Sequence, residues 1–142
     1  MTRIEFTVPA VPVAQPRPRA TNVGKTHARM YEAESDHPVH TFKALVKLVA
    51  RDALADGKPL TGPLSAMMRF VFPRLSSARK GTGRVIKSTR PDLDNLAKSV
   101  LDSLNNLAYK DDGQVQHLTI EKLHAGPDEQ PSVWVCIEEI VF

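Results

Sequence analysis

Hydrophobic positions divide the 142-residue chain into four predicted strands and two predicted helices. Alternating or continuous apolar residues, bounded by proline and glycine, predict strands at 3–8, 64–72, 115–125 and 132–142. Helical spacing of apolar residues predicts amphipathic helices over 37–55 and about 93–107. Because only the short segment GPDEQP separates the last two strands, we expect these strands to form a hairpin.

These elements predict the α+β class, with two helices packed on one mixed four-stranded sheet in a single small domain over residues 1–142. Two long segments, at about 9–36 and 73–91, lack a sustained hydrophobic period and are predicted to be loops. Five prolines between Pro9 and Pro38 keep the first loop out of a helix or a central strand. Loops of this length in a compact domain are usually functional or disordered.

Composition narrows the class of protein further. An apolar content of 42% and a charged content of 25% are typical of a globular protein, and no apolar run approaches the ~20 residues needed to span a bilayer. The N-terminal residues lack the apolar core of a signal peptide, and the single cysteine, Cys136, excludes an intrachain disulfide. We therefore expect a cytoplasmic protein without a membrane partner.

Lysine and arginine are concentrated in the two predicted loops, although the net charge is only +3. Residues 69–90 contain seven of them and residues 11–31 contain four, in both cases without an acid, whereas residues 111–142 contain seven acids and one lysine. This asymmetry predicts a polyanionic partner, and the alternative for either loop alone is a solvated surface. The candidates for phosphate contacts are Arg17, Arg19, Arg79, Lys80, Arg84 and Lys87.

Carboxylates gather at the start of the second predicted helix, in the segment RPDLDNLAKSVLDSLN. Asp92 falls at the N-cap position after Pro91 and Asp94 falls in the first turn, so one interpretation is that both acids stabilise the helix terminus. Asp94, Lys98 and Asp102 are spaced four residues apart and therefore form one stripe on the polar face of the helix.

A second group of carboxylates, Asp111 and Asp112, follows the helix in the segment YKDDGQV. Neighbouring carboxylates repel one another unless a cation neutralises them, and magnesium prefers such oxygen ligands. The other interpretation is therefore a magnesium site for phosphate chemistry, in which Lys98 stabilises charge on the phosphate instead of only pairing with Asp94. A helix of fifteen residues is about 22 Å long, so only the tertiary structure can bring both groups together.

The two acidic segments, RPDLDNLAKSVLDSLN and AYKDDGQV, resemble the signature of the RusA-type Holliday junction resolvases, small endonucleases of phages and prophages. That signature is Asp-x-Asp-Asn, a following lysine, a further aspartate in the same helix and an Asp-Asp pair before a strand. The corresponding residues here are Asp92, Asp94, Asn95, Lys98, Asp102, Asp111 and Asp112. The segments PVAQPRPRA and EKLHA are also similar to parts of that family, whereas the loop between residues 73 and 90 is long for it.

The resemblance implies a RusA-like fold and a magnesium-dependent homodimer that resolves four-way DNA junctions by paired symmetric cuts, with Mn²⁺ as a substitute metal, in a bacterial or phage-infected cell. It implies that Asp92, Asp94 and Asp112 are the essential acids and metal ligands, with Asp111 and Lys98 in support. A two-fold dimer is also expected because two symmetric cuts need two sites and each chain offers one. The alternatives are a non-catalytic DNA-binding protein and a nuclease that prefers forks or flaps.

Overall fold

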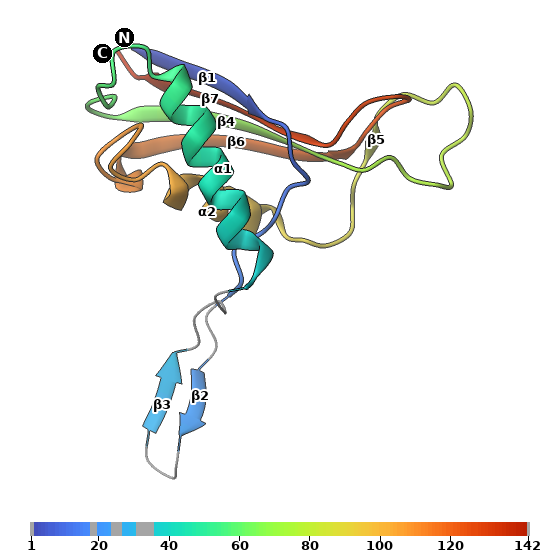
Figure 1. Ribbon diagram of the computed structural model, residues 1–142, viewed down its shortest axis with the longest axis horizontal. Helices are drawn as coiled ribbons and strands as arrows, with labels where there is room; N and C mark the ends of the chain where they lie inside the picture. Colours follow the sequence, from blue (N-terminus) through green and yellow to red (C-terminus); the bar gives the residue numbers. More distant parts are fainter. Residues whose placement is uncertain (1, 18–19, 24–26, 31–35, 142) are drawn as a thin grey trace.

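The computed structural model describes residues 2–17, 20–23, 27–30 and 36–141, and its main feature is a five-stranded mixed sheet (Figure 1). The strands lie in the order β1, β7, β4, β6, β5. They comprise β1 (Arg3–Val8), β4 (Leu64–Phe72), β5 (Val85–Ile86), β6 (Val115–His124) and β7 (Ser132–Glu139). The strands β2 (Ala20–Val23) and β3 (His27–Met30) pair with each other in a separate two-stranded sheet.

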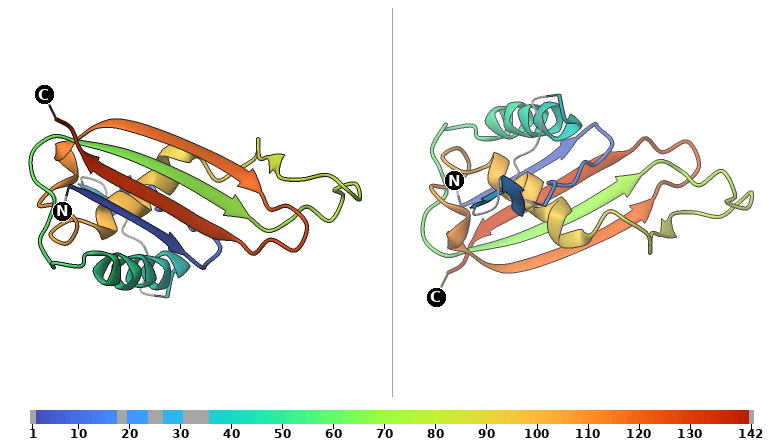
Figure 2. Two further views of the ribbon diagram at one scale, coloured as in Figure 1. Left: turned by 90° about the horizontal axis from the view of Figure 1, so that it is seen from above. Right: turned by 90° about the horizontal axis from the view of Figure 1, so that it is seen from below.

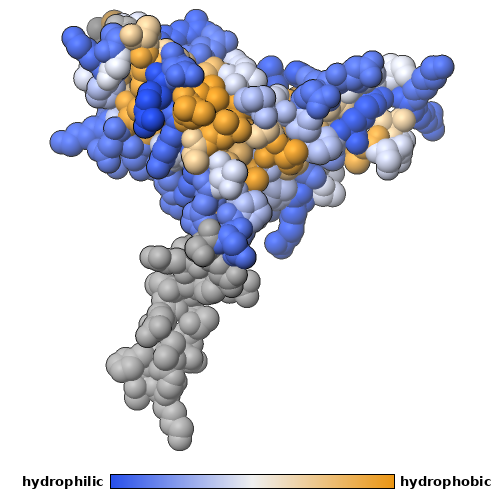
Figure 3. Space-filling view, in the orientation of Figure 1, coloured by the Kyte–Doolittle hydropathy of each residue, from blue (hydrophilic) through white to orange (hydrophobic). Residues whose placement is uncertain are grey.

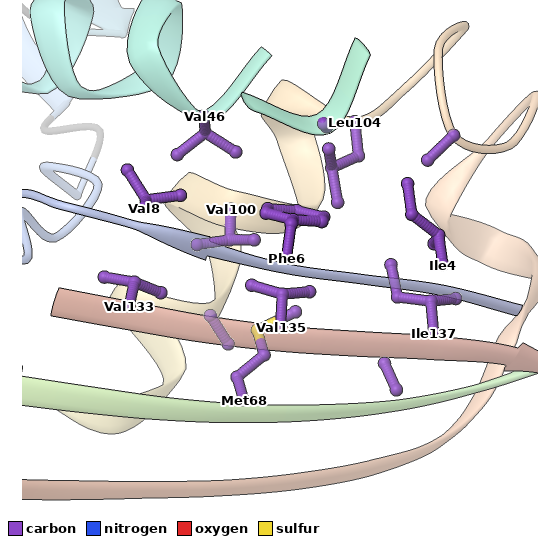
Figure 4. Packing of buried hydrophobic residues seen from close by; sticks show 14 of the residues in the cluster. Ile4, Phe6, Val8, Val46, Met68, Val100, Leu104, Val133, Val135 and Ile137 are labelled. Carbon is purple, nitrogen blue, oxygen red and sulfur yellow. The ribbon is translucent and has the colours of Figure 1, made fainter. Parts of the chain in front are cut away.

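Two helices, α1 (Pro38–Ala53) and α2 (Leu93–Ser103), cover one face of the five-stranded sheet and leave the other face open (Figure 2). The alternation in β1 explains this arrangement, because every second residue of that strand is buried and the others are exposed. Figure 4 shows the packed side chains of the resulting core, which include Ile4, Phe6, Val8, Val46, Met68, Val100, Leu104, Val133, Val135 and Ile137. The predicted α+β class is confirmed, with one strand more in the sheet than expected.

The order of the strands corrects the expected hairpin. Strands β6 and β7 do not pair, because β4 lies between them, parallel to β6 and antiparallel to β7. Consecutive strands usually pair, but here β4 separates β6 from β7, and in this central position it has the most continuously buried pattern of the three. The fifth strand, β5, was missed because only two residues of the second basic loop pair with the end of β6.

The second helix ends earlier than predicted, at Ser103 instead of about residue 107. Asn106 adopts a left-handed backbone with φ of 61°, a conformation that asparagine tolerates better than most residues and that interrupts a helix. The buried Tyr109 closes the following turn, since its hydroxyl donates a hydrogen bond of 2.6 Å to the carbonyl of Leu101. This turn returns the chain to the C-terminal end of α2, where Asp111 and Asp112 precede β6.

No helix among the described residues combines the length and the hydropathy that a membrane span requires.

Candidate active site on the second helix

The N-terminal end of α2 carries two exposed carboxylates that share one cation. Asp92 occupies the N-cap position, but its side chain makes no capping hydrogen bond. Instead, Asp92 Oδ2 accepts a hydrogen bond of 3.3 Å from Arg17 Nη2, and Asp94 Oδ2 lies 3.5 Å from the same nitrogen. The capping interpretation of Asp92 therefore gives its position correctly and its contact wrongly. The Asp92 carboxylate contacts the guanidinium of Arg17 and not the backbone of the helix.

A cavity of about 370 Å³ adjoins this pair and is lined by Ala14, Gln15, Pro16, Arg17, Arg90, Asp92 and Asn95. The backbone N–H of Gln15 donates a hydrogen bond of 2.9 Å to the carbonyl of Asn95, which attaches the first basic loop to α2. The side-chain oxygen Oε1 of Gln15 is buried, and it has no hydrogen-bond partner among the described residues. A buried acceptor without a partner is costly.

A lysine from the sheet holds the chain segment that precedes Asp92. Lys122 Nζ, from β6, donates hydrogen bonds of 2.6 Å to the carbonyl of Thr89 and 2.7 Å to the carbonyl of Pro91. These two bonds hold the chain on both sides of Arg90 immediately before the acidic pair. The sequence places Lys122 in the segment EKLHA, but no local pattern indicates which carbonyls it contacts.

A second polar group lies at the C-terminal end of the same helix. Asp102 Oδ2 is 3.6 Å from Lys98 Nζ and 3.9 Å from Lys43 Nζ of α1. Asp112 lies beside Asp102, and the pKa of Asp112 is raised first by burial and then by the charges of Asp111 and Asp102. Burial also lowers the pKa of Lys43, more than the neighbouring Asp102 raises it. The helical spacing of polar residues places Lys43 on the polar face of α1, but this spacing does not identify Asp102 as its partner.

Hydrogen bonds to the backbone hold the two aspartates that follow the helix. Asn105 Oδ1 accepts a hydrogen bond of 2.8 Å from the N–H of Asp112. The carboxylate of Asp111 accepts one of 3.0 Å from the N–H of Gly113, and Gln114 Oε1 accepts one of 3.1 Å from the N–H of Asp111. Asp111 and Gln114 therefore form a capping box for the short 3₁₀ turn Asp112–Gln114, a structural role that the pair Asp-Asp did not indicate.

The structure thus divides the predicted acids between the two ends of α2. Asp92 and Asp94 lie together with Arg17, whereas Asp112 lies with Asp102. Eight residues separate Asp94 from Asp102, which corresponds to about 12 Å of helix. No group of three or more His, Cys, Asp or Glu side chains in the described part of the chain is arranged to hold a metal ion. The expected gathering of Asp112 with the N-terminal pair is therefore not seen among these residues, because the length of the helix lies between them.

The donor atoms at the N-terminal pair nevertheless suit a hard divalent cation. Mg²⁺ is usually bound by one or two carboxylates together with waters and substrate phosphates, so a large cage of protein ligands is not needed. Asp92 and Asp94 provide two neighbouring carboxylates, and Asp92 lines the adjoining cavity together with the polar residues Gln15 and Asn95. The residues present therefore fit a magnesium or manganese ion.

The second basic loop forms an arm that extends beyond the sheet, and Figure 3 shows mainly hydrophilic residues over it (Figures 1 and 3). Arg74 organises this arm, because its guanidinium donates hydrogen bonds to four carbonyls, those of Arg79, Thr82, Gly83 and Ala125. These distances range from 3.0 to 3.3 Å. One basic residue that was not among the DNA-contact candidates therefore shapes the surface that carries several of them.

The basic candidates differ in how free they are to meet a phosphate. Arg79 and Lys80 are exposed, and neither side chain forms an ion pair with another described residue. Lys87 Nζ lies 4.9 Å from the centre of the Phe72 ring and 2.9 Å from Thr89 Oγ1. Arg84 is engaged with Glu129, whose pKa it lowers to about 2. Arg17 contacts the acids described above, and Arg19 lies outside the described residues.

Comparison with known proteins adds two findings. Residues 9–138 match the family described as Endodeoxyribonuclease RusA, which is most of the chain. The whole chain is also similar to the uncharacterized protein YqaN of Bacillus subtilis (strain 168), with 38% identity over 149 aligned positions that cover 99% of each protein.

Proposed function

Because the chain belongs to the RusA family of endodeoxyribonucleases, we propose that it resolves four-way DNA junctions by hydrolysing one phosphodiester bond in each of two opposed strands. The observation that carries the proposal is the exposed pair Asp92 and Asp94 at the start of α2. Their carboxylates form no capping hydrogen bond, and their partner is the guanidinium of a single arginine. Two neighbouring carboxylates free of capping hydrogen bonds are available to bind a cation.

In this proposal Asp92 and Asp94 hold a magnesium or manganese ion. The resemblance also implies Asp112 and Asp111 as ligands, but these two lie at the other end of α2 and are not assigned to the same ion. When bound, the ion supplies polarisation of a phosphoryl oxygen and a more acidic water. Lys98 lies between the two acidic groups on the same helix, and its side chain is 56% exposed. Its ammonium is placed to stabilise negative charge on the phosphate, in addition to pairing with Asp102.

The basic arm has a complementary role in holding the duplex. Arg79 and Lys80 are exposed on a segment that Arg74 keeps in one shape, so their charges are presented without a large cost of ordering. Phosphate contacts of this kind position DNA without reading its sequence and make binding strongly dependent on salt. Arg84 contributes less in this proposal, since Glu129 already neutralises it.

We propose that the active form is a homodimer. Each chain has one Asp92–Asp94 pair, and two coordinated cuts on opposed strands require two such pairs related by a two-fold axis. Light scattering after gel filtration should then give twice the 15.7 kDa mass of one chain. A monomeric mass at the concentrations used for cleavage would contradict this part of the proposal.

The central test is Asp92→Asn, compared with wild type on labelled four-way, forked and linear DNA with and without Mg²⁺. The variant should bind the junction as wild type does, because the basic arm is unchanged. It should lose cleavage by at least about a hundredfold, since a metal ligand matters at least as much as the groups that orient ligands. Asp128→Asn is the matched control, because Asp128 is an exposed turn residue with a positive φ that asparagine also tolerates.

The outcomes of that experiment distinguish the proposed function from its alternatives. Cleavage by Asp92→Asn at the wild-type rate would show that the acidic pair does not hold the metal. Preferred cutting of forks or flaps would keep the nuclease chemistry and change the substrate. Junction binding that is indifferent to Mg²⁺, with no product from wild type after long incubation, would favour a non-catalytic DNA-binding protein.

A further inference from the structure

Arg17 occupies the space between two carboxylates that the proposed function assigns to a divalent cation. One nitrogen, Nη2, is 3.3 Å from Asp92 Oδ2 and 3.5 Å from Asp94 Oδ2. A positive charge at this point relieves the repulsion between the two acids, which is also what a bound cation would do. The guanidinium and a divalent ion therefore compete for the same pair of oxygens.

We propose that Arg17 is a built-in competitor of the metal, which neutralises Asp92 and Asp94 in the metal-free protein and is released to a DNA phosphate when a divalent cation is bound. This inference rests on the proposed function for the cation site and for its DNA step. Arg17 thereby acts at a defined step in the order of binding, whereas the sequence shows it only as one of several basic residues in a loop.

The contact has the properties of one that can be broken. The side chains of Arg17, Asp92 and Asp94 are 65%, 48% and 72% exposed, so water competes for every partner. A single nitrogen makes both contacts, and its distances exceed the 2.7–2.9 Å of a strong charge-assisted hydrogen bond. Exposed ion pairs of this kind contribute little, and two carboxylates attract a doubly charged ion more strongly than a singly charged one.

The backbone that carries Arg17 is nevertheless held at the site. The N–H of Gln15 donates to the carbonyl of Asn95 on α2, and the only residue between this anchor and Arg17 is Pro16, whose ring fixes its φ angle. A released guanidinium consequently stays beside the cavity that Arg17 shares with Arg90 and Asp92. Its planar fork matches a phosphate group, so the displaced side chain has a second partner close by only when DNA is present.

The first test measures Mn²⁺ binding by calorimetry to the full chain, as wild type and as Arg17→Ala, Arg17→Lys and Arg79→Ala. Removal of the competitor should make Arg17→Ala bind Mn²⁺ about twofold to thirtyfold more tightly, as expected for two exposed ion pairs. Arg17→Lys keeps the charge, so its Mn²⁺ affinity should stay nearer to that of wild type. Arg79→Ala should bind Mn²⁺ as tightly as wild type does. An unchanged or weaker affinity of Arg17→Ala overturns the proposal, because a merely structural residue would weaken the site when removed.

The second test measures junction binding by fluorescence anisotropy with and without Ca²⁺. Wild type should gain at least threefold more affinity from Ca²⁺ than Arg17→Ala does, since only wild type has a guanidinium to release. Equal gains would overturn the transfer of Arg17 to the phosphate. Arg17→Gln repeats both tests if circular dichroism shows that the alanine variant is misfolded.

These results are separable from the fate of the proposed function. Absence of junction cleavage by wild type with either Mg²⁺ or Mn²⁺ would refute the nuclease proposal. The ratio of Mn²⁺ affinities between Arg17→Ala and wild type would still decide whether Arg17 competes with the cation.

Discussion

Asp112→Asn should make the metal-free protein more stable at neutral pH, although Asp112 is one of the residues proposed for catalysis. In wild type, the Asp112 carboxylate is partly buried against the carboxylate of Asp102, with Asp111 next to it in the chain. An asparagine has the same shape, and its amide can donate a hydrogen bond to Asp102 where a second carboxylate repels it. The change therefore removes a conflict without opening a cavity.

The expected gain follows from the two like-charge neighbours. A like-charge pair on a helix surface destabilises it by about 0.2–0.5 kcal/mol, so two pairs give about 0.4–1 kcal/mol, reduced by the lost attraction of Asp112 to Lys98. The sign with pH is fixed, because the folded-state pKa of Asp112 is raised above its ordinary value of 3.8. Wild type keeps its full stability below pH 3.8 and loses it relative to the variant as pH rises through the raised pKa.

Urea denaturation in EDTA at pH 7.5 and near pH 3.8 would measure this difference. The variant should be more stable by up to about 1 kcal/mol at pH 7.5, with a smaller advantage at the lower pH. Asp128→Asn makes the same chemical change at an exposed turn and controls for net charge. A destabilised Asp112→Asn, or an advantage that is equal at both pH values, would refute the electrostatic reasoning about this group.

Two further changes test the elements that position the site. Arg74→Ala should increase hydrogen exchange across residues 73–91 and weaken junction binding several-fold with little change in global stability, because three carbonyls of the arm and that of Ala125 lose their shared donor. Unchanged exchange in the arm would show that Arg74 does not organise it. Lys122→Met keeps the aliphatic stem and removes two charged hydrogen bonds, so it should cost about 1–3 kcal/mol in urea denaturation and slow cleavage, whereas Lys110→Met, at an exposed position, should do neither.

Much of the local structure follows from short-range patterns in the chain. The period-2 alternation of β1 predicts which of its side chains are buried, and the spacing of Leu96, Val100 and the neighbouring apolar residues predicts α2 and its inner face. The stripe of Asp94, Lys98 and Asp102 follows from the same helix period. Such features depend on neighbours within about four residues, and the sequence alone therefore determines them.

The tertiary structure decided everything that joins distant segments. Arg17 meets Asp92 across 75 positions, and Arg74 meets the carbonyl of Ala125 across 51, so no local period could reveal either contact. The central place of β4 likewise depends on the whole sheet. The short segment GPDEQP between β6 and β7 does not reveal that β4 lies between these two strands. The division of the aspartates has the same origin. Their spacing along the chain is fixed by the sequence, but the helix length and the turn closed by Tyr109 bring Asp112 to Asp102.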